Sequence, residues 1–90
     1  MPIIAGNWKM NKSLAQGLEW VSSLDPVPAG VTAALFPPAT LLLPLLAGLK
    51  DRSVMAGCQD CHWENSGAYT GEISPVQLAE DGVGAVLVGH

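Results

Sequence analysis

The chain has 90 residues, enough for one small domain, and 49% of them are hydrophobic while only 13% are charged. Eight acidic and four basic residues give a net charge of −4, and the four cations form no stripe that could follow a nucleic-acid backbone. Nucleic acid is therefore not an expected partner.

The uncharged stretch 31–49 is long enough to raise the question of a membrane span, but three prolines interrupt it, so no membrane association is expected. The amino terminus lacks the pattern of a signal peptide, which favours a reducing, cytoplasmic location.

Four short, mostly apolar segments predict strands. They lack the alternation of polar and apolar residues that is typical of a half-exposed strand, so we expect them to be buried on both faces of a sheet. These segments are 1–5, 31–36, 53–57 and 84–89.

The stretch between the first two strands predicts a helix. Ser13 followed by Gln16 is a capping-box pattern, which indicates that the helix begins there. The pair Asp25-Pro26 is expected to end it. Apolar residues recur between these points at the spacing of one helix face, namely Leu14, Leu18, Val21 and, if the helix reaches so far, Leu24.

Two further helices are predicted. After the second strand Pro37-Pro38 turns the chain, and a helix is expected at about 40–50, with Pro44 tolerated only if it lies near the first turn. The third strand leads into a long loop at 58–73. Ser74-Pro75 then resembles an N-cap followed by proline at the first helical position, and the helix should end near Gly82.

Strands that alternate with helices predict a parallel α/β sheet with right-handed crossovers. Ligands of such sheets bind at the carboxyl ends of the strands. Polar or turn-forming residues follow each predicted strand, and this topology brings Asn7, Lys9 and His90 to one edge, with Gln59 and Asp60 at the end of the third strand.

Asn7 and Lys9 are the first candidate site residues. A single lysine at a strand end is more often a solvated surface residue than a ligand-binding one. Asn7 lies two residues earlier on the same strand face, however, so an amide and a cation converge where an anionic or carbonyl substrate could bind. His90 is either a histidine without function or an acid or electrophile held at a strand end, and the spacing does not decide between the two.

The run Cys58-Gln59-Asp60-Cys61-His62 requires separate consideration, because C-x-x-C-H is the attachment pattern of c-type haem and C-x-x-C alone suggests redox or zinc chemistry. Covalent haem attachment would need export, and a zinc site would need a fourth ligand that cannot be placed from the sequence. The favoured interpretation is two structural cysteines at the end of a buried strand, with a haem or redox carrier as the alternative.

Three separated motifs resemble one known family. GNWKMNK at 6–12, SGAYTGEISP at 66–75 and VLVGH at 86–90 are similar to triosephosphate isomerases, in the same order and at about the same spacing. The resemblance implies a (β/α)8 TIM barrel, of which residues 1–90 would be the N-terminal part of a single domain and supply strands 1–4 and helices 1–3. It also implies an isomerase of glycolysis and gluconeogenesis that interconverts dihydroxyacetone phosphate and D-glyceraldehyde 3-phosphate by proton transfer through an enediol.

The resemblance assigns roles to individual residues. Lys9 looks like the lysine that stabilises negative charge on the phosphorylated triose, Asn7 like the substrate-binding amide beside it, and His90 like the neutral imidazole that polarises the carbonyl. The 62–73 loop is similar to the one through which the family forms homodimers, and no cofactor or metal is implied. The interface residues expected from this similarity are Met10, Tyr69, Thr70, Gly71 and Glu72.

The glutamate base, the mobile lid and the phosphate-binding loops of the family would all lie beyond His90. A full barrel of this class takes about 250 residues. The chain is therefore expected to be a fragment that is inactive by itself and needs the remaining barrel segment. As a fragment it should have open strand edges and an uncovered sheet face. The alternative is a non-catalytic fragment that keeps only the dimerisation loop and acts as an interaction module.

Overall fold

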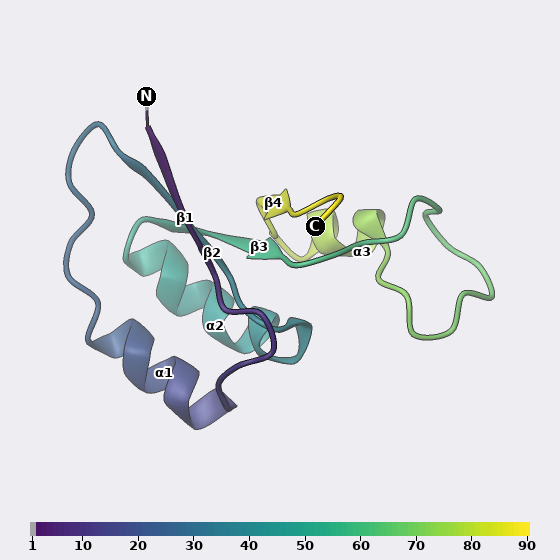
Figure 1. Ribbon diagram of the computed structural model, residues 1–90, viewed down its shortest axis with the longest axis horizontal. Helices are drawn as coiled ribbons and strands as arrows, with labels where there is room; N and C mark the ends of the chain where they lie inside the picture. The colour runs from purple at the N-terminus through teal and green to yellow at the C-terminus, as the bar shows by residue number, and fades with distance from the viewer. Residues whose placement is uncertain (1) are drawn as a thin grey trace.

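The computed structural model describes residues 2–90, so the start of the first predicted strand at Met1 lies outside the described residues. Strands and helices alternate along the chain as predicted (Figure 1). The strands are β1 (Ile3–Asn7), β2 (Thr32–Phe36), β3 (Val54–Cys58) and β4 (Ala85–Val86). The helices are α1 (Leu14–Ser22), α2 (Ala39–Asp51) and α3 (Pro75–Glu80).

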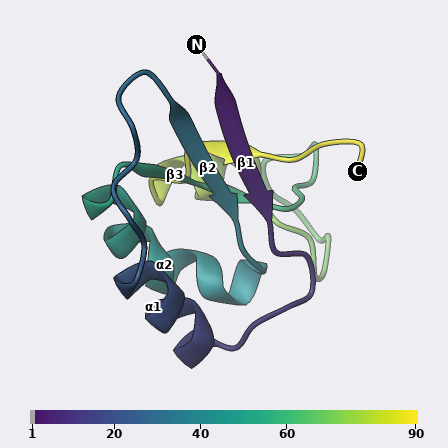
Figure 2. The same cartoon turned by 60° about the vertical axis from the view of Figure 1, so that its left-hand side comes forward.

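The four strands form one parallel sheet in the order β1-β2-β3-β4. Asn7 of β1 lies beside Phe36 of β2, and Gly57 of β3 lies beside Ala85 of β4, so all four carboxyl ends meet at one edge. Helices α1 and α2 cover one face of β1 and β2, and the strands are rotated strongly against one another (Figure 2). This order of sequential, parallel strands with helices between them is consistent with the first part of a (β/α)8 barrel.

The hydrophobic core lies between the sheet and α2. Leu45 and Leu49 of α2 are 1% and 0% exposed, and they belong to one cluster with Leu35 of β2 and with Val54 and Cys58 of β3. Burial of this apolar surface is the main force that holds the helices against the sheet. Among residues 2–90, no helix combines the length and the hydrophobicity needed to cross a membrane.

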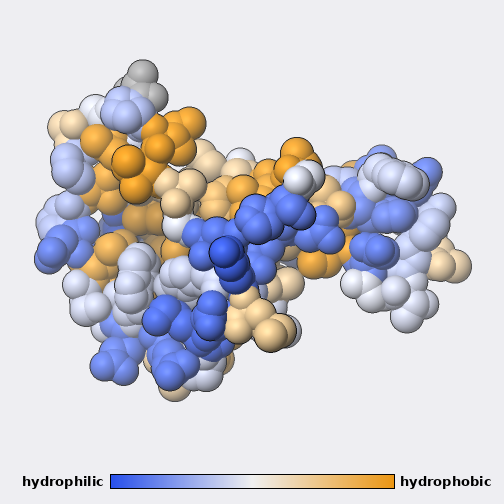
Figure 3. All heavy atoms as spheres, viewed as in Figure 1, coloured by the Kyte–Doolittle hydropathy of each residue, from blue (hydrophilic) through white to orange (hydrophobic). Residues whose placement is uncertain are grey.

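Strand β1 is not buried on both faces, contrary to the prediction. Ile3 and Ile4 are 68% and 64% exposed, because β1 is at one end of the described sheet and has only β2 beside it. Figure 3 shows apolar side chains gathered on the surface over the part of the molecule where β1 begins. This surface matches the uncovered sheet that the sequence leads us to expect.

The capping box of α1 is confirmed, but its buried face is only partly the predicted one: Val21 is buried as expected, while Leu14 and Leu18 are not. The Ser13 hydroxyl accepts from the Gln16 main-chain N–H at 3.3 Å, and the Gln16 side chain accepts from the Ser13 N–H at 2.9 Å. Gly17 and Val21 are buried, whereas Leu14 and Leu18 are exposed. Glycine allows close approach at this point, because a Cβ at Gly17 would lie 3.3 Å from Leu45 and 3.4 Å from Trp8. The helix ends at Ser22, so Leu24 lies beyond it.

Helix α2 begins with Ala39 after an N-cap at Pro38, so Pro44 is its sixth residue and not part of the first turn as predicted. Proline there cannot donate to the carbonyl of Thr40 four residues earlier. Pro44 and Thr40 are both exposed, so water can reach this side of the helix. Burial of the leucines on the opposite side stabilises the helix in spite of the missing hydrogen bond.

Candidate active site

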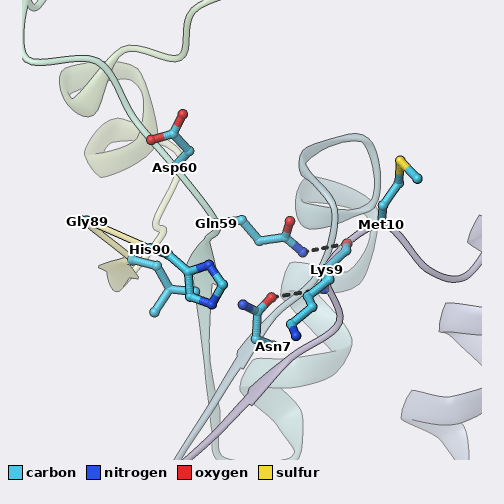
Figure 4. A pocket seen from close by; sticks show the side chains of 8 residues that line it. Asn7, Lys9, Met10, Gln59, Asp60, Gly89 and His90 are labelled. Atoms are coloured by element: carbon cyan, nitrogen blue, oxygen red, sulfur yellow. Dashed lines mark hydrogen bonds between the residues drawn. The ribbon is translucent and has the colours of Figure 1, made fainter.

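A depression of about 560 Å³ lies at the carboxyl ends of the strands. It contains Asn7, Lys9 and His90, the three residues that the strand-end argument places together (Figure 4). The last residue of β1 and the segments that follow β1, β3 and β4 supply its walls. The full set of lining residues is Asn7, Lys9, Met10, Gln59, Asp60, Leu87, Gly89 and His90.

The main chain of Lys9 is held on both sides by side-chain amides. Its φ is +55°, in the left-handed region that L-residues rarely occupy. The Lys9 N–H donates to Oδ1 of Asn7 at 2.9 Å, and the Lys9 carbonyl accepts from Nε2 of Gln59 at 2.8 Å. A backbone conformation of this kind persists only where surrounding contacts impose it.

Gln59 also fixes the end of β2. Its Nε2 donates to the carbonyl of Phe36 at 2.9 Å, and the same carbonyl accepts from the Trp8 N–H at 3.1 Å. The amide of Gln59 therefore ties the ends of β1, β2 and β3 together. The sequence placed Gln59 at the correct edge but assigned it no role; its polar side chain directly after a buried strand was the available signal.

The polar groups of the pocket suit an anion or a carbonyl compound. Lys9 is exposed and supplies the positively charged side chain of the lining. Figure 4 shows the Asn7 amide and the His90 imidazole near one another, beside Lys9. The Asp60 carboxylate lines the same depression but points away from these three residues. A cation, an amide and an imidazole without an opposing carboxylate can bind negative charge and polarise a C=O group.

His90 lies further from its strand than predicted. Strand β4 covers only Ala85–Val86, and one further main-chain hydrogen bond, from the Leu87 N–H to the Cys58 carbonyl at 2.9 Å, continues the pairing with β3. Gly89 then adopts a φ of +71°, which glycine tolerates without strain. The prediction of a strand over 84–89 was therefore wrong in length, although His90 still reaches the depression.

The expected interface residues fall into two groups. Met10 lines the depression and is 96% exposed. Tyr69, Thr70, Gly71 and Glu72 do not line it; they belong to the loop after β3, which extends away from the sheet (Figure 1).

This loop has an ordered base. The His62 N–H donates to the Ile73 carbonyl at 2.8 Å, and the Ser74 hydroxyl donates to the Asn65 carbonyl at 2.6 Å. The rings of His62 and Tyr69 lie 4.3 Å apart between centroids. Packing and hydrogen bonds within the loop therefore give it a defined shape.

The cysteines do not fit the haem alternative. Cys58 is 1% exposed and belongs to the hydrophobic core, whereas Cys61 is half-buried, and both thiols are free. Attachment of haem at C-x-x-C-H needs both sulfur atoms to be accessible on one side of the chain. Within residues 2–90, no group of three or more histidine, cysteine or acidic side chains could hold a metal ion.

Comparison with known proteins agrees with the fold. A family model described as triosephosphate isomerase matches residues 2–90. A triosephosphate isomerase from Pelobacter propionicus is 41% identical over 92 residues, an alignment that covers 99% of this chain and 37% of the relative. The chain thus spans 37% of the length of this curated relative. Because this match includes every described residue, the chain belongs to the triosephosphate isomerase family.

Proposed function

We propose that the full-length protein containing this chain interconverts dihydroxyacetone phosphate and D-glyceraldehyde 3-phosphate through an enediol. The observation that carries this proposal is the convergence of Asn7, Lys9 and His90 on one depression in a member of this family. The substrates carry a phosphate and a carbonyl group. A lysine beside an amide and an imidazole is suited to both.

Each of the three residues has a separate task. Lys9 supplies fixed positive charge that attracts the phosphorylated substrate and stabilises the negative charge that develops on the enediolate. The Asn7 amide nitrogen, whose oxygen is already bonded to the Lys9 main chain, is available to the substrate. The His90 imidazole donates to the substrate oxygen as that oxygen gains negative charge.

The proton on the substrate carbon needs a base that these residues do not supply. The Asp60 carboxylate points away from Asn7, Lys9 and His90, so it is poorly placed for this step. We propose that the base is a glutamate from the remaining barrel segment, which would also provide the phosphate-binding loops. The chain corresponds to 37% of its relative, and the complete site requires those further elements.

The proposed active form is a homodimer that acts in glycolysis and gluconeogenesis in the cytoplasm. The 62–73 loop supports this proposal because it extends away from the sheet and carries exposed residues from Tyr69 to Glu72. The exposed thioether side chain of Met10, beside the active site, would lie in or near the same interface.

The test is a coupled isomerase assay on the full-length protein. We expect Lys9→Met and His90→Gln each to lower kcat/KM by about 100-fold or more, because each removes a group that stabilises developing charge. Lys50→Met is the matched control, since Lys50 is exposed on α2 and does not line the depression. No isomerase activity in a folded dimer would contradict the proposal and favour the interaction module.

A further inference from the structure

Asn11 does not line the active-site depression, but it closes the turn that carries Lys9. Its side-chain Nδ2 donates to the main-chain carbonyl of Trp8 at 2.8 Å. The hydrogen bond spans three residues and encloses Lys9 and Met10. Asparagine side chains commonly stabilise turns by bonding to nearby main-chain groups in this way.

The residue to which Asn11 bonds is itself anchored on α1. The Trp8 ring packs edge-on against Trp20 with centroids 5.3 Å apart, and it lies close to Gly17. The ammonium group of Lys12 lies 5.3 Å from the centroid of the Trp8 ring. Trp8 therefore gives the turn a fixed point on the helix side.

The two lysines of this segment differ in their surroundings although both have left-handed main chains. Lys12, at a φ of +75°, directs its ammonium group to the Trp8 ring. Lys9, at a φ of +55°, lines the active-site depression instead. If the turn relaxed to an ordinary extended conformation, the Lys9 side chain would leave from its Cα in a different direction.

We propose that Asn11 is a positioning residue: by closing the turn from Trp8, it holds the Lys9 main chain in the left-handed conformation that directs the ammonium group into the depression. Asn7 and Gln59 hold the N–H and the carbonyl of Lys9 itself, and Asn11 fixes the peptide that precedes it. The consequence for substrate binding rests on the proposed isomerase function. The consequence for the Lys9 conformation does not.

The experiment compares Asn11→Leu, which has a similar shape but no donor, with the full-length wild-type protein. We expect KM for the triose phosphate to rise about tenfold while kcat changes less than threefold. The reason is that a displaced cation weakens binding of the charged ground state and of the charged transition state by similar amounts. Asn11→Gln retains an amide donor on a longer side chain and should recover part of the affinity. Ser23→Ala is the matched control: its hydroxyl donates to the Trp20 carbonyl at 2.9 Å over the same three-residue span. Ser23 is the C-cap of α1 and does not line the depression, so kinetics should not change.

A second readout does not depend on activity. The ¹³Cα and ¹³Cβ chemical shifts of Lys9 report its main-chain conformation, and Asn11→Leu should move them from left-handed toward extended values. Asn11→Asp, which also lacks the donor but stays polar, serves if the leucine variant does not fold. Unchanged Lys9 shifts in a folded variant would overturn the proposal. Shifts that move in a protein without isomerase activity would support it and would contradict only the proposed function.

Discussion

Gln59 and Lys9 are fifty residues apart in the sequence, and the side-chain amide of the first donates to the main-chain carbonyl of the second at 2.8 Å. The same nitrogen atom reaches the carbonyl of Phe36 at 2.9 Å. One amide thus joins three strand ends at the edge where ligands of parallel sheets bind. The position of the Lys9 cation depends on a residue of another strand as well as on its own turn.

We expect Gln59→Leu to destabilise the full-length protein by about 1–3 kcal/mol, since it removes two hydrogen bonds: the exposed Lys9 carbonyl loses its donor, and the part-buried Phe36 carbonyl keeps only the Trp8 N–H. It should also raise KM, because the Lys9 carbonyl loses its constraint. Urea denaturation and steady-state kinetics measure the two effects. Gln77→Leu is the control, because the Gln77 side chain is exposed and makes no hydrogen bond among residues 2–90. Equal stability of the two variants would show that the Gln59 hydrogen bonds contribute nothing net.

The two serine N-caps should differ in strength. Ser13 is exposed and caps α1 alone, whereas Ser74 is 9% exposed, caps α3 and also donates to the Asn65 carbonyl at 2.6 Å. We expect Ser13→Ala to cost about 1 kcal/mol and Ser74→Ala about 2–3 kcal/mol. Denaturation midpoints compared with Ser66→Ala, an exposed loop serine, test this. A larger loss for Ser13→Ala would show that the loop bond of Ser74 is not stabilising.

Gly57 of β3 is packed against the ring of Phe36, and a Cβ at this position would overlap the ring. Phe36 is 5% exposed, so the ring cannot move aside without disturbing the buried face. We expect Gly57→Ala to destabilise the protein by about 1–3 kcal/mol. Gly6→Ala is the matched strand control: its Cβ would lie 3.4 Å from Leu35, an ordinary contact, and stability should be unchanged or slightly higher. Combining Gly57→Ala with Phe36→Leu should recover part of the loss, and no recovery would argue against the overlap.

The order of strands and helices and the meeting of Asn7, Lys9 and His90 could be predicted from the sequence, because both follow from local periodicity and from the rule that parallel strands end at one edge. The role of Gln59 could not, since its two acceptors lie 50 and 23 residues away and meet it only in the folded chain. No local pattern reports such a distance.

Local patterns also failed where packing decides the outcome. Leu14 and Leu18 have the spacing of a buried helix face, but Gly17 lies against Trp8 and Leu45, so the helix is rotated to bury the glycine side. The exposure of Ile3 likewise depends on the position of β1 in the sheet and not on its hydrophobicity. Apolar spacing predicts that a segment is helical or extended more reliably than it predicts which side is covered.

Pro44 offers the clearest test of how packing overrides local preference. It is the sixth residue of α2 and cannot donate to the Thr40 carbonyl, and proline in a helix interior is about 3 kcal/mol less favourable than alanine. Alanine would restore the donor, but it would also give the unfolded chain more freedom, which offsets about 1 kcal/mol. We therefore expect Pro44→Ala to stabilise the full-length protein by about 1–2 kcal/mol, measured by urea denaturation.

Pro38→Ala is the control for this change. Pro38 is the N-cap of α2, where no main-chain donor is required inside the helix, so alanine restores no hydrogen bond and should give no gain in stability. Pro44 is exposed, which limits the apolar contact that its replacement can lose. A contrary outcome would be a Pro44→Ala variant that is neutral or destabilised while Pro38→Ala behaves as expected. The Thr40 carbonyl would then be as stable when bonded to water as when bonded within the helix, and restoring this hydrogen bond would not stabilise α2.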